Sequence, residues 1–270
     1  MQTYHHLYVP GNKLEFVNKA IEKGAQNVII DLEDSIPLGE KDAVREDVCR
    51  FLSNNKFELN ISVRINSNND FQQKDIQLLI DTGIENIFVP KLDIDSLIVK
   101  NNLGNNFKII IGIIETATGL NNIQKIAEKI SLERLAIGEV DFSADLGIEE
   151  SQESLLFYRS KLVFASKSLG LKKPIGGVFK NLNDVSGLER FAFNIKNLGF
   201  GGMQAIHPGQ LATINKIFKP SDQEISEAKE LLKEIRENDS NGIGVFVDGN
   251  GSIVDAAMVK KAQDIIYYSE

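Results

Sequence analysis

The chain has 270 residues, of which 42% are hydrophobic and 25% charged, and these are ordinary values for a globular protein. Its net charge of -8 at pH 7 argues against a nucleic-acid-binding surface, which needs a basic face, but leaves an anionic small molecule open as a ligand. A single cysteine, Cys49, excludes a disulfide framework or a cysteine-rich metal site within one chain.

No apolar stretch approaches the roughly 20 residues that a membrane-spanning helix needs. The N-terminal segment Met1-Gln-Thr-Tyr-His-His-Leu-Tyr-Val-Pro10 lacks the basic and apolar regions of a secretory signal. We therefore expect a cytoplasmic protein that does not act in a membrane.

Short apolar runs alternate with amphipathic helical stretches along most of the chain. In chain order, strands are predicted at residues 6–9, 28–32, 61–65, 87–90, 109–114, 135–137, 175–178 and 203–206. Helices are predicted between them, among them 12–23, 40–52 and 151–169. Glycines at typical helix C-cap positions follow several of these helices: Gly24, Gly83, Gly170 and Gly199.

Short, continuously apolar strands are typical of a parallel sheet that is buried on both faces. Eight of them alternating with helices favour a (β/α)₈ TIM barrel of the α/β class. A doubly wound sheet with a Rossmann site is the alternative. It is disfavoured because no G-x-G-x-x-G motif follows an early strand.

The pattern changes after Gln210. A polar helix at 221–236, a link rich in Gly, Asn and Asp at 238–244 and a final helix at 252–268 are predicted, with no further barrel strand. We interpret residues 1–218 as the barrel and 219–270 as a short C-terminal helical extension. The extension would pack on the barrel or on a neighbouring subunit.

Three charged residues each end an apolar run. Arg64 ends the run that starts at Ile61, Glu115 the run from Lys108, and Asp141 the run from Leu135. Active sites of (β/α)₈ barrels lie at the carboxyl ends of the strands, so the three side chains are expected at one rim.

The chemistry of these residue types points to a metal site. Mg²⁺ prefers oxygen ligands, commonly one or two carboxylates together with water and substrate oxygens. Glu115 and Asp141 are predicted to bind Mg²⁺ and leave positions for a 2-keto- or 2-hydroxycarboxylate. Arg64 would stabilise negative charge that develops on a substrate oxygen. The alternative for Arg64 is an ion pair with Glu33 or Asp34 at the barrel mouth.

At these residues the sequence resembles the citrate lyase β-subunit-like family of the HpcH/HpaI aldolase superfamily. The segments that carry the resemblance run in order from end to end: Leu7-Tyr-Val-Pro-Gly-Asn12, Asp31-Leu-Glu-Asp-Ser35 with Lys41 and Arg45, Val63-Arg-Ile-Asn66, Pro90-Lys91, Glu115-Thr-Ala-Thr-Gly119, Gly138-Glu-Val-Asp-Phe-Ser-Ala-Asp-Leu-Gly147 and Ala205-Ile-His-Pro208.

The resemblance implies a Mg²⁺-dependent acyl-CoA lyase on a TIM barrel, acting on a citryl-, malyl- or citramalyl-CoA-type thioester to give an acyl-CoA and a 2-keto acid. It implies that Glu115 and Asp141 bind Mg²⁺ and that Arg64 contacts the keto acid or polarises its carbonyl. It also implies an acid/base Asp that a neighbouring subunit of a homotrimer donates. Asp255, in Gly251-Ser-Ile-Val-Asp255, is the candidate. The alternative for Asp255 is a helix N-terminal residue that the macrodipole favours.

Further positions are assigned on the same resemblance. Glu33 and Asp34 are expected to orient Arg64 or metal-bound water. Cationic or imidazole side chains that could meet CoA, or could equally be surface or structural groups, are Lys13, Lys41, Arg45, Lys91 and His207.

Three other functions stay open. One is a CoA-independent, metal-dependent aldolase acting on pyruvate- or oxaloacetate-type substrates. Another is the β subunit of a citrate lyase complex whose thioester is bound to a carrier protein. A non-catalytic scaffold is less favoured, because a scaffold has no physical need for a metal-competent rim.

Overall fold

The computed structural model describes residues 4–57, 59–101, 103–239, 246–247, 253–267 and 269. Within these residues the chain divides into two compact units, one ending at Asn215 and the other running from Lys216. The division falls inside one helix, α9 (Leu211–Phe218).

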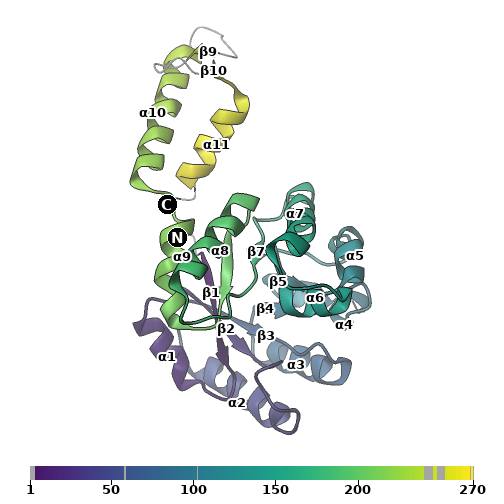
Figure 1. Ribbon diagram of the computed structural model, residues 1–270. Coiled ribbons are helices and arrows are strands. Elements are labelled where there is room, and N and C mark those ends of the chain that lie inside the picture. The colour runs from purple at the N-terminus through teal and green to yellow at the C-terminus, as the bar shows by residue number, and fades with distance from the viewer. Residues whose placement is uncertain are drawn as a thin grey trace. The chain divides into compact units, whose positions relative to one another are not determined.

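The first unit is a closed barrel of eight parallel strands in the described residues, which confirms the predicted fold class (Figure 1). Each strand pairs with the next one in sequence, and β1 pairs with β8 to close the barrel. The strands are β1 (His5–Pro10), β2 (Asn27–Asp31), β3 (Asn60–Arg64), β4 (Asn86–Val89), β5 (Ile109–Ile114), β6 (Arg134–Ile137), β7 (Ile175–Gly176) and β8 (Gly202–Ala205).

Helices connect the strands and surround the barrel (Figure 1). They are α1 (Glu15–Glu22), η1 (Leu38–Glu40), α2 (Lys41–Asn54), α3 (Asn69–Asp81), α4 (Leu97–Lys100), η2 (Leu103–Asn106), α5 (Ala117–Ala127), α6 (Glu139–Leu146), α7 (Gln152–Ser168), α8 (Val185–Leu198) and η3 (Pro208–Gln210), followed by α9.

The apolar strand runs are buried on both faces, as a parallel sheet requires. All five residues of β2 are buried, for example. A cluster of buried side chains from β2, β4, β5, β6 and β7 packs together in the core: Ile29, Phe88, Ile111, Ile113, Ala136 and Ile175. The partly buried side chains of Tyr8 and Ile109 pack against this cluster.

The four glycines predicted at helix ends all adopt positive φ angles, 83° at Gly24, 71° at Gly83, 70° at Gly170 and 104° at Gly199. Residues with a Cβ rarely adopt this conformation, so glycine ends the helix without backbone strain.

Two predicted strand ends are corrected by the structure. The seventh strand ends at Gly176 rather than at Val178, because the chain leaves the ladder where Gly177 packs against the Glu139 side chain. Asp141 lies in the first turn of α6 and not at the end of a strand. Gly138 makes this change: its N–H still donates to Ile114 in the sheet, while its carbonyl already accepts from Phe142 in the helix.

The second unit contains α10 (Asp222–Asp239), the short antiparallel strands β9 (Phe246–Val247) and β10 (Ile253–Val254), and α11 (Ala256–Tyr267). Ala228 of α10 and Ala262 of α11 are buried. None of the described helices in either unit combines the length and the apolar character that crossing a membrane requires.

Candidate active site

A cavity of about 480 Å³ lies at the carboxyl ends of the barrel strands. It brings together three of the predicted site residues, Arg64, Glu115 and Asp141, together with Asp34. The other residues that line it are Tyr8, Pro10, Asp31, Ser35, Ile137, Gly138, Glu139, Val140, Val178, Gln204 and Ile206. The predicted common rim is therefore a real concave site.

Arg64 is held in place by a carboxylate that the sequence analysis did not single out. Its Nε and Nη2 donate to the two oxygens of Asp31 over 2.6 and 2.7 Å. Its Nη1 lies 3.3 Å from Glu33 and 3.2 Å from Asp34, as the ion-pair interpretation expected. The guanidinium also lies 4.7 Å from the centre of the Tyr8 ring.

The Asp31 carboxylate is fully occupied. Besides Arg64, it accepts hydrogen bonds from the backbone N–H groups of Glu33 at 2.9 Å and Ser35 at 3.0 Å. Burial opposes ionisation of Asp31, but the bonds and charge of Arg64 outweigh it, so the pKa of Asp31 lies below its usual value. A buried, bidentate Asp31 therefore fixes the direction in which Arg64 points.

Glu115 is buried, and its Oε2 accepts a hydrogen bond from the backbone N–H of Lys91 at 3.1 Å. Burial, followed by the negative charges of Glu33 and Asp141, raises the pKa of Glu115 to about 8. Burial also raises the pKa of Glu33 to about 7, although the Arg64 guanidinium opposes that shift. Oε1 of Glu33 is buried and makes no hydrogen bond to any residue that the structure describes.

Gly138 leaves room for the Glu115 side chain. A Cβ at position 138 would lie 2.5 Å from Glu115 Cγ and 2.6 Å from its Oε1, closer than real Cβ contacts. The glycine that follows β6 thus lets the ends of β5 and β6 approach each other around this carboxylate.

Asp141 is half-exposed, and its Oδ1 lies 3.8 Å from the Lys91 ammonium. Lys91 itself has a φ of 45°, a conformation that residues other than glycine rarely adopt. This backbone geometry accompanies the use of the Lys91 N–H as the donor to Glu115.

These carboxylates fit a divalent cation. Burial is the main cause of the raised pKa values of Glu33 and Glu115, and neighbouring negative charges add to both shifts; a bound cation would lower the cost of ionising these carboxylates. Among the residues that the structure describes, no group of three or more His, Cys, Asp or Glu side chains is arranged to ligate a metal by itself. Two carboxylates, Glu115 and Asp141, would leave positions for water and substrate oxygens on a bound Mg²⁺.

A hydrogen-bonded pair that the sequence analysis missed lies beside Arg64. The Tyr8 hydroxyl donates to Oε1 of Gln204 at 2.7 Å. Nε2 of Gln204 in turn donates to the carbonyls of Ile137 and Gly176, at 2.9 and 3.0 Å. Burial raises the pKa of Tyr8, which keeps its hydroxyl neutral. A lone Gln in an apolar strand run was the available signal for this pair.

Two of the cations assigned to CoA are engaged inside the protein. Lys41 donates to the carbonyls of Leu32 and Glu33 and to Oδ1 of Asn66, at 3.0, 2.7 and 2.5 Å, which uses all three of its N–H bonds. Arg45 is buried and forms ion pairs with Asp75 and Asp42. In this conformation both residues brace the loops behind the site.

The remaining three candidates are more accessible. Lys13 is exposed, with its ammonium 5.7 Å from the centre of the Phe16 ring, and Lys91 is 44% exposed. His207 is exposed and caps η3 by accepting the Gly209 N–H at 3.0 Å. A role in CoA binding stays a prediction for all five residues.

Asp255 lies in the second unit, immediately before α11. Its exposed carboxylate accepts the backbone N–H groups of Ala257 at 2.9 Å and Met258 at 3.0 Å. It is thus a helix N-cap, as the macrodipole interpretation expected. Its proposed acid/base role stays a prediction, and Gly251 of the same motif lies outside the described residues.

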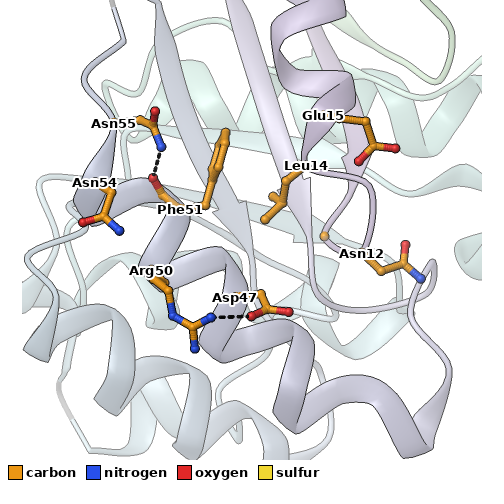
Figure 2. A pocket seen from close by; sticks show the side chains of 9 residues that line it. Asn12, Leu14, Glu15, Asp47, Arg50, Phe51, Asn54 and Asn55 are labelled. Atoms are coloured by element: carbon orange, nitrogen blue, oxygen red, sulfur yellow. Dashed lines mark hydrogen bonds and ion pairs between the residues drawn. The ribbon is translucent and has the colours of Figure 1, made fainter.

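A second hollow, also of about 480 Å³, lies between the start of α1 and α2 (Figure 2). Its charged and amide groups largely pair with neighbours: Arg50 with Asp47 at 3.1 Å, and Asn55 Nδ2 with the Phe51 carbonyl at 2.7 Å. None of the rim carboxylates is among the residues that line it. It is therefore separate from the site at the strand ends.

Comparison with known proteins agrees with this geometry. A family model of HpcH/HpaI aldolase/citrate lyase matches residues 5–208. Citrate lyase subunit beta of Leuconostoc mesenteroides subsp. cremoris is 30% identical, over 96% of this chain and 91% of its own length. The human mitochondrial citramalyl-CoA lyase is 28% identical, over 96% of this chain and 83% of its own.

A solved structure shares the barrel. The citrate lyase beta subunit from Mycobacterium tuberculosis, complexed with oxaloacetate and magnesium, is 25% identical to this chain with a TM-score of 0.68. The match covers 81% of this chain and 97% of that one.

Proposed function

The chain belongs to the HpcH/HpaI aldolase/citrate lyase family, and we propose that it is a Mg²⁺-dependent lyase of acyl-CoA thioesters. The substrate would be of the citryl-, malyl- or citramalyl-CoA type, and cleavage would give an acyl-CoA and a 2-keto acid. The observation that carries this proposal is that one cavity contains Glu115, Asp141 and Arg64. The Glu115 carboxylate is buried and has a raised pKa, and Asp31 holds Arg64 in place.

In this function Glu115 and Asp141 would hold Mg²⁺, and Glu33 would orient Arg64 or a metal-bound water. When bound, Mg²⁺ would supply Lewis-acid polarisation of the substrate's 2-keto or 2-hydroxy oxygen. Arg64 would bind an oxygen of the keto acid and stabilise negative charge on it. Asp31 and the Tyr8 ring keep the guanidinium oriented before substrate arrives, so little reorganisation is needed.

The reaction also needs a proton transfer. Cleavage removes the hydroxyl proton of the substrate, breaks the adjacent C–C bond as the keto acid forms, and adds a proton to the acyl carbon left behind. We assign the acid/base role to Asp255. Its exposed carboxylate, at the start of a helix outside the barrel unit, supports a role at a site in a neighbouring subunit.

We further propose that the protein is a homotrimer. Large aromatic side chains are exposed on α7 and α8: Phe157 at 65%, Phe164 at 73% and Phe193 at 55%. Phe157 and Phe164 are seven residues apart and so lie on one side of α7, and a second copy of this chain would cover that side.

One observation favours a second candidate. Lys41 and Arg45 are occupied by Asn66, Asp42 and Asp75, so they offer little to CoA phosphates. A metal-dependent aldolase acting on pyruvate- or oxaloacetate-type substrates needs the rim carboxylates and Arg64 but no phosphate pocket. The same holds for a citrate lyase β subunit that receives its thioester on a carrier protein.

A substrate panel tests the proposal. Citryl-, malyl- and citramalyl-CoA, the matching pantetheine thioesters and free hydroxy-keto acids would be incubated with Mg²⁺ or with EDTA. Formation of the 2-keto acid and of the shortened acyl thioester would be measured by chromatography. We expect Mg²⁺-dependent cleavage of at least one CoA thioester.

Matched variants complete that experiment. Asp141→Ala should abolish Mg²⁺-dependent cleavage without unfolding the protein, because the side chain is half-exposed. Asp47→Ala, which removes an exposed carboxylate outside the site, should cleave at the wild-type rate. Turnover of free hydroxy-keto acids alone would establish the aldolase instead, and cleavage that survives EDTA would remove the metal from the mechanism.

A further inference from the structure

A buried ion pair lies on the wall of the site, just behind the proposed metal carboxylates. Glu139 and Arg159 are 4% and 2% exposed. Nε and Nη2 of Arg159 donate to the two oxygens of Glu139 at 2.8 and 2.7 Å. Nη1 of Arg159 donates to Gln152 at 2.6 Å, and its guanidinium lies 5.5 Å from the centre of the Phe191 ring.

The Glu139 side chain occupies a space shaped for it. A Cβ at position 177 would lie 2.8 Å from Glu139 Cδ and 2.9 Å from its Cγ, so only a glycine fits there. The pair therefore joins the first residue of α6 to α7, beneath the turn that follows β7.

The other end of α6 is tied as well. Asp145 accepts the backbone N–H of Ala117 at 2.8 Å, two residues after Glu115. Asp141 lies between these two attachments. Gly138, which directly precedes Glu139, is the residue that packs against Glu115. The position of α6 thus determines where both proposed metal ligands lie relative to each other.

Stability alone does not account for the Glu139–Arg159 pair. Replacing a buried ion pair by apolar side chains of similar size is often neutral or stabilising. A bidentate guanidinium–carboxylate pair, in contrast, defines direction as well as distance. We therefore expect this ion pair to contribute by fixing the orientation of α6 and not by raising the free energy of unfolding.

We propose that Arg159 is a positioning residue: through Glu139 it fixes the first turn of α6 and thereby sets Asp141 against Glu115 for Mg²⁺ binding. This inference rests on the proposed Mg²⁺ site. Arg159 itself would touch neither metal nor substrate. Its removal should therefore weaken Mg²⁺ binding without removing a ligand.

The test measures Mg²⁺ affinity of the metal-free protein by titration calorimetry, together with its melting temperature without Mg²⁺. The main variant is Glu139→Leu/Arg159→Met, which removes both charges and leaves no buried ion alone. The matched control is Lys172→Met, which breaks the Lys172–Glu133 pair (2.6 Å) next to the opposite end of β6. We expect the double variant to keep its melting temperature and bind Mg²⁺ about 10–100-fold more weakly, and the control to bind like wild type.

Arg159→Lys keeps the charge but loses the bidentate fork, and it serves if the double variant does not fold. We expect its Mg²⁺ affinity to lie between those of wild type and the double variant. Wild-type Mg²⁺ affinity in a folded double variant, or in Arg159→Lys, would overturn the positioning role and leave the proposed function intact. Failure of the wild-type protein to bind Mg²⁺ would instead overturn the metal site itself.

Discussion

At the scale of single residues, Glu115 carries a conflict between stability and function. Its carboxyl is buried beside the charges of Glu33 and Asp141, and its Oε2 accepts a hydrogen bond from the backbone N–H of Lys91. The pKa of about 8 records the cost of ionising it there. A cation that reduces this cost would bind through the same interaction.

The raised pKa predicts how Mg²⁺ binding depends on pH. Below about pH 8 the metal-free protein holds a proton on Glu115, and Mg²⁺ must displace it, so affinity should fall as pH falls from 8 toward 6. Calorimetry in buffers of different ionisation enthalpy should detect up to about one proton released per Mg²⁺ near pH 7. A pH-independent affinity across this range would contradict a ligand role for Glu115.

The same shift has a consequence for stability. The native state binds this proton more tightly than the unfolded chain, where a glutamate titrates near its model value of 4.5. The contribution of Glu115 to the free energy of unfolding should therefore fall as pH rises from about 4.5 to about 8. Glu115→Gln removes the titration, so the variant should lose this dependence as well as Mg²⁺ binding.

At the scale of elements, a buried polar network braces the loops behind the rim. Asp75 of α3 accepts from the N–H and Nδ2 of Asn66, at 2.7 and 2.8 Å, and pairs with Arg45 of α2. Asn66 in turn accepts from Lys41, which binds the carbonyls of Leu32 and Glu33. The loop that carries Glu33 is thus fixed by α2, α3 and the loop after β3 together.

Asp75→Ala should break this network. It leaves the Arg45 guanidinium buried without its main partner, which costs about 3–5 kcal/mol of unfolding free energy. Urea unfolding at constant m value would measure the loss. Asp47→Ala, which removes one half of the exposed pair with Arg50, should stay close to wild type. If the two variants had equal free energies of unfolding, the network would not stabilise the packing of α2 and α3 against the loops behind the rim.

At the scale of the whole molecule, the residues assigned to the reaction are divided between the two units of the chain. The rim residues belong to the unit that ends at Asn215, whereas Asp255 belongs to the unit that runs from Lys216. If Asp255 acts in a neighbouring subunit, neither unit of one chain completes the site alone.

Mixed oligomers test this arrangement. Asp255→Asn and Asp141→Ala should each be inactive alone. After co-refolding, a barrel with intact Asp141 can meet an intact Asp255 from its neighbour, so roughly a quarter of the sites in a randomly mixed cyclic trimer should be active. If Asp255 acts within its own chain, the mixture should stay inactive.

Much of the fold followed from sequence pattern. The alternation of apolar strands and amphipathic helices predicted the closed barrel, and glycines at helix ends marked the turns at Gly24, Gly83, Gly170 and Gly199. These signals are local, since strand burial and positive φ depend on residue type. The prediction that Asp141 ends a strand was wrong, because α6 begins at Glu139 and residue pattern does not separate its first turn from the preceding strand.

The sequence by itself determined the barrel and the charges at its rim, because parallel strands bring their carboxyl ends to one edge wherever the apolar runs stop. Only the tertiary structure decided which charges are partners. Arg64 donates two hydrogen bonds to Asp31 in addition to its ion pairs with Glu33 and Asp34. Lys41 donates to the carbonyls of Leu32 and Glu33. It also brought Glu139 to Arg159, 20 residues away in the chain. Such pairings depend on distance and burial between separate elements, which residue type and spacing do not encode.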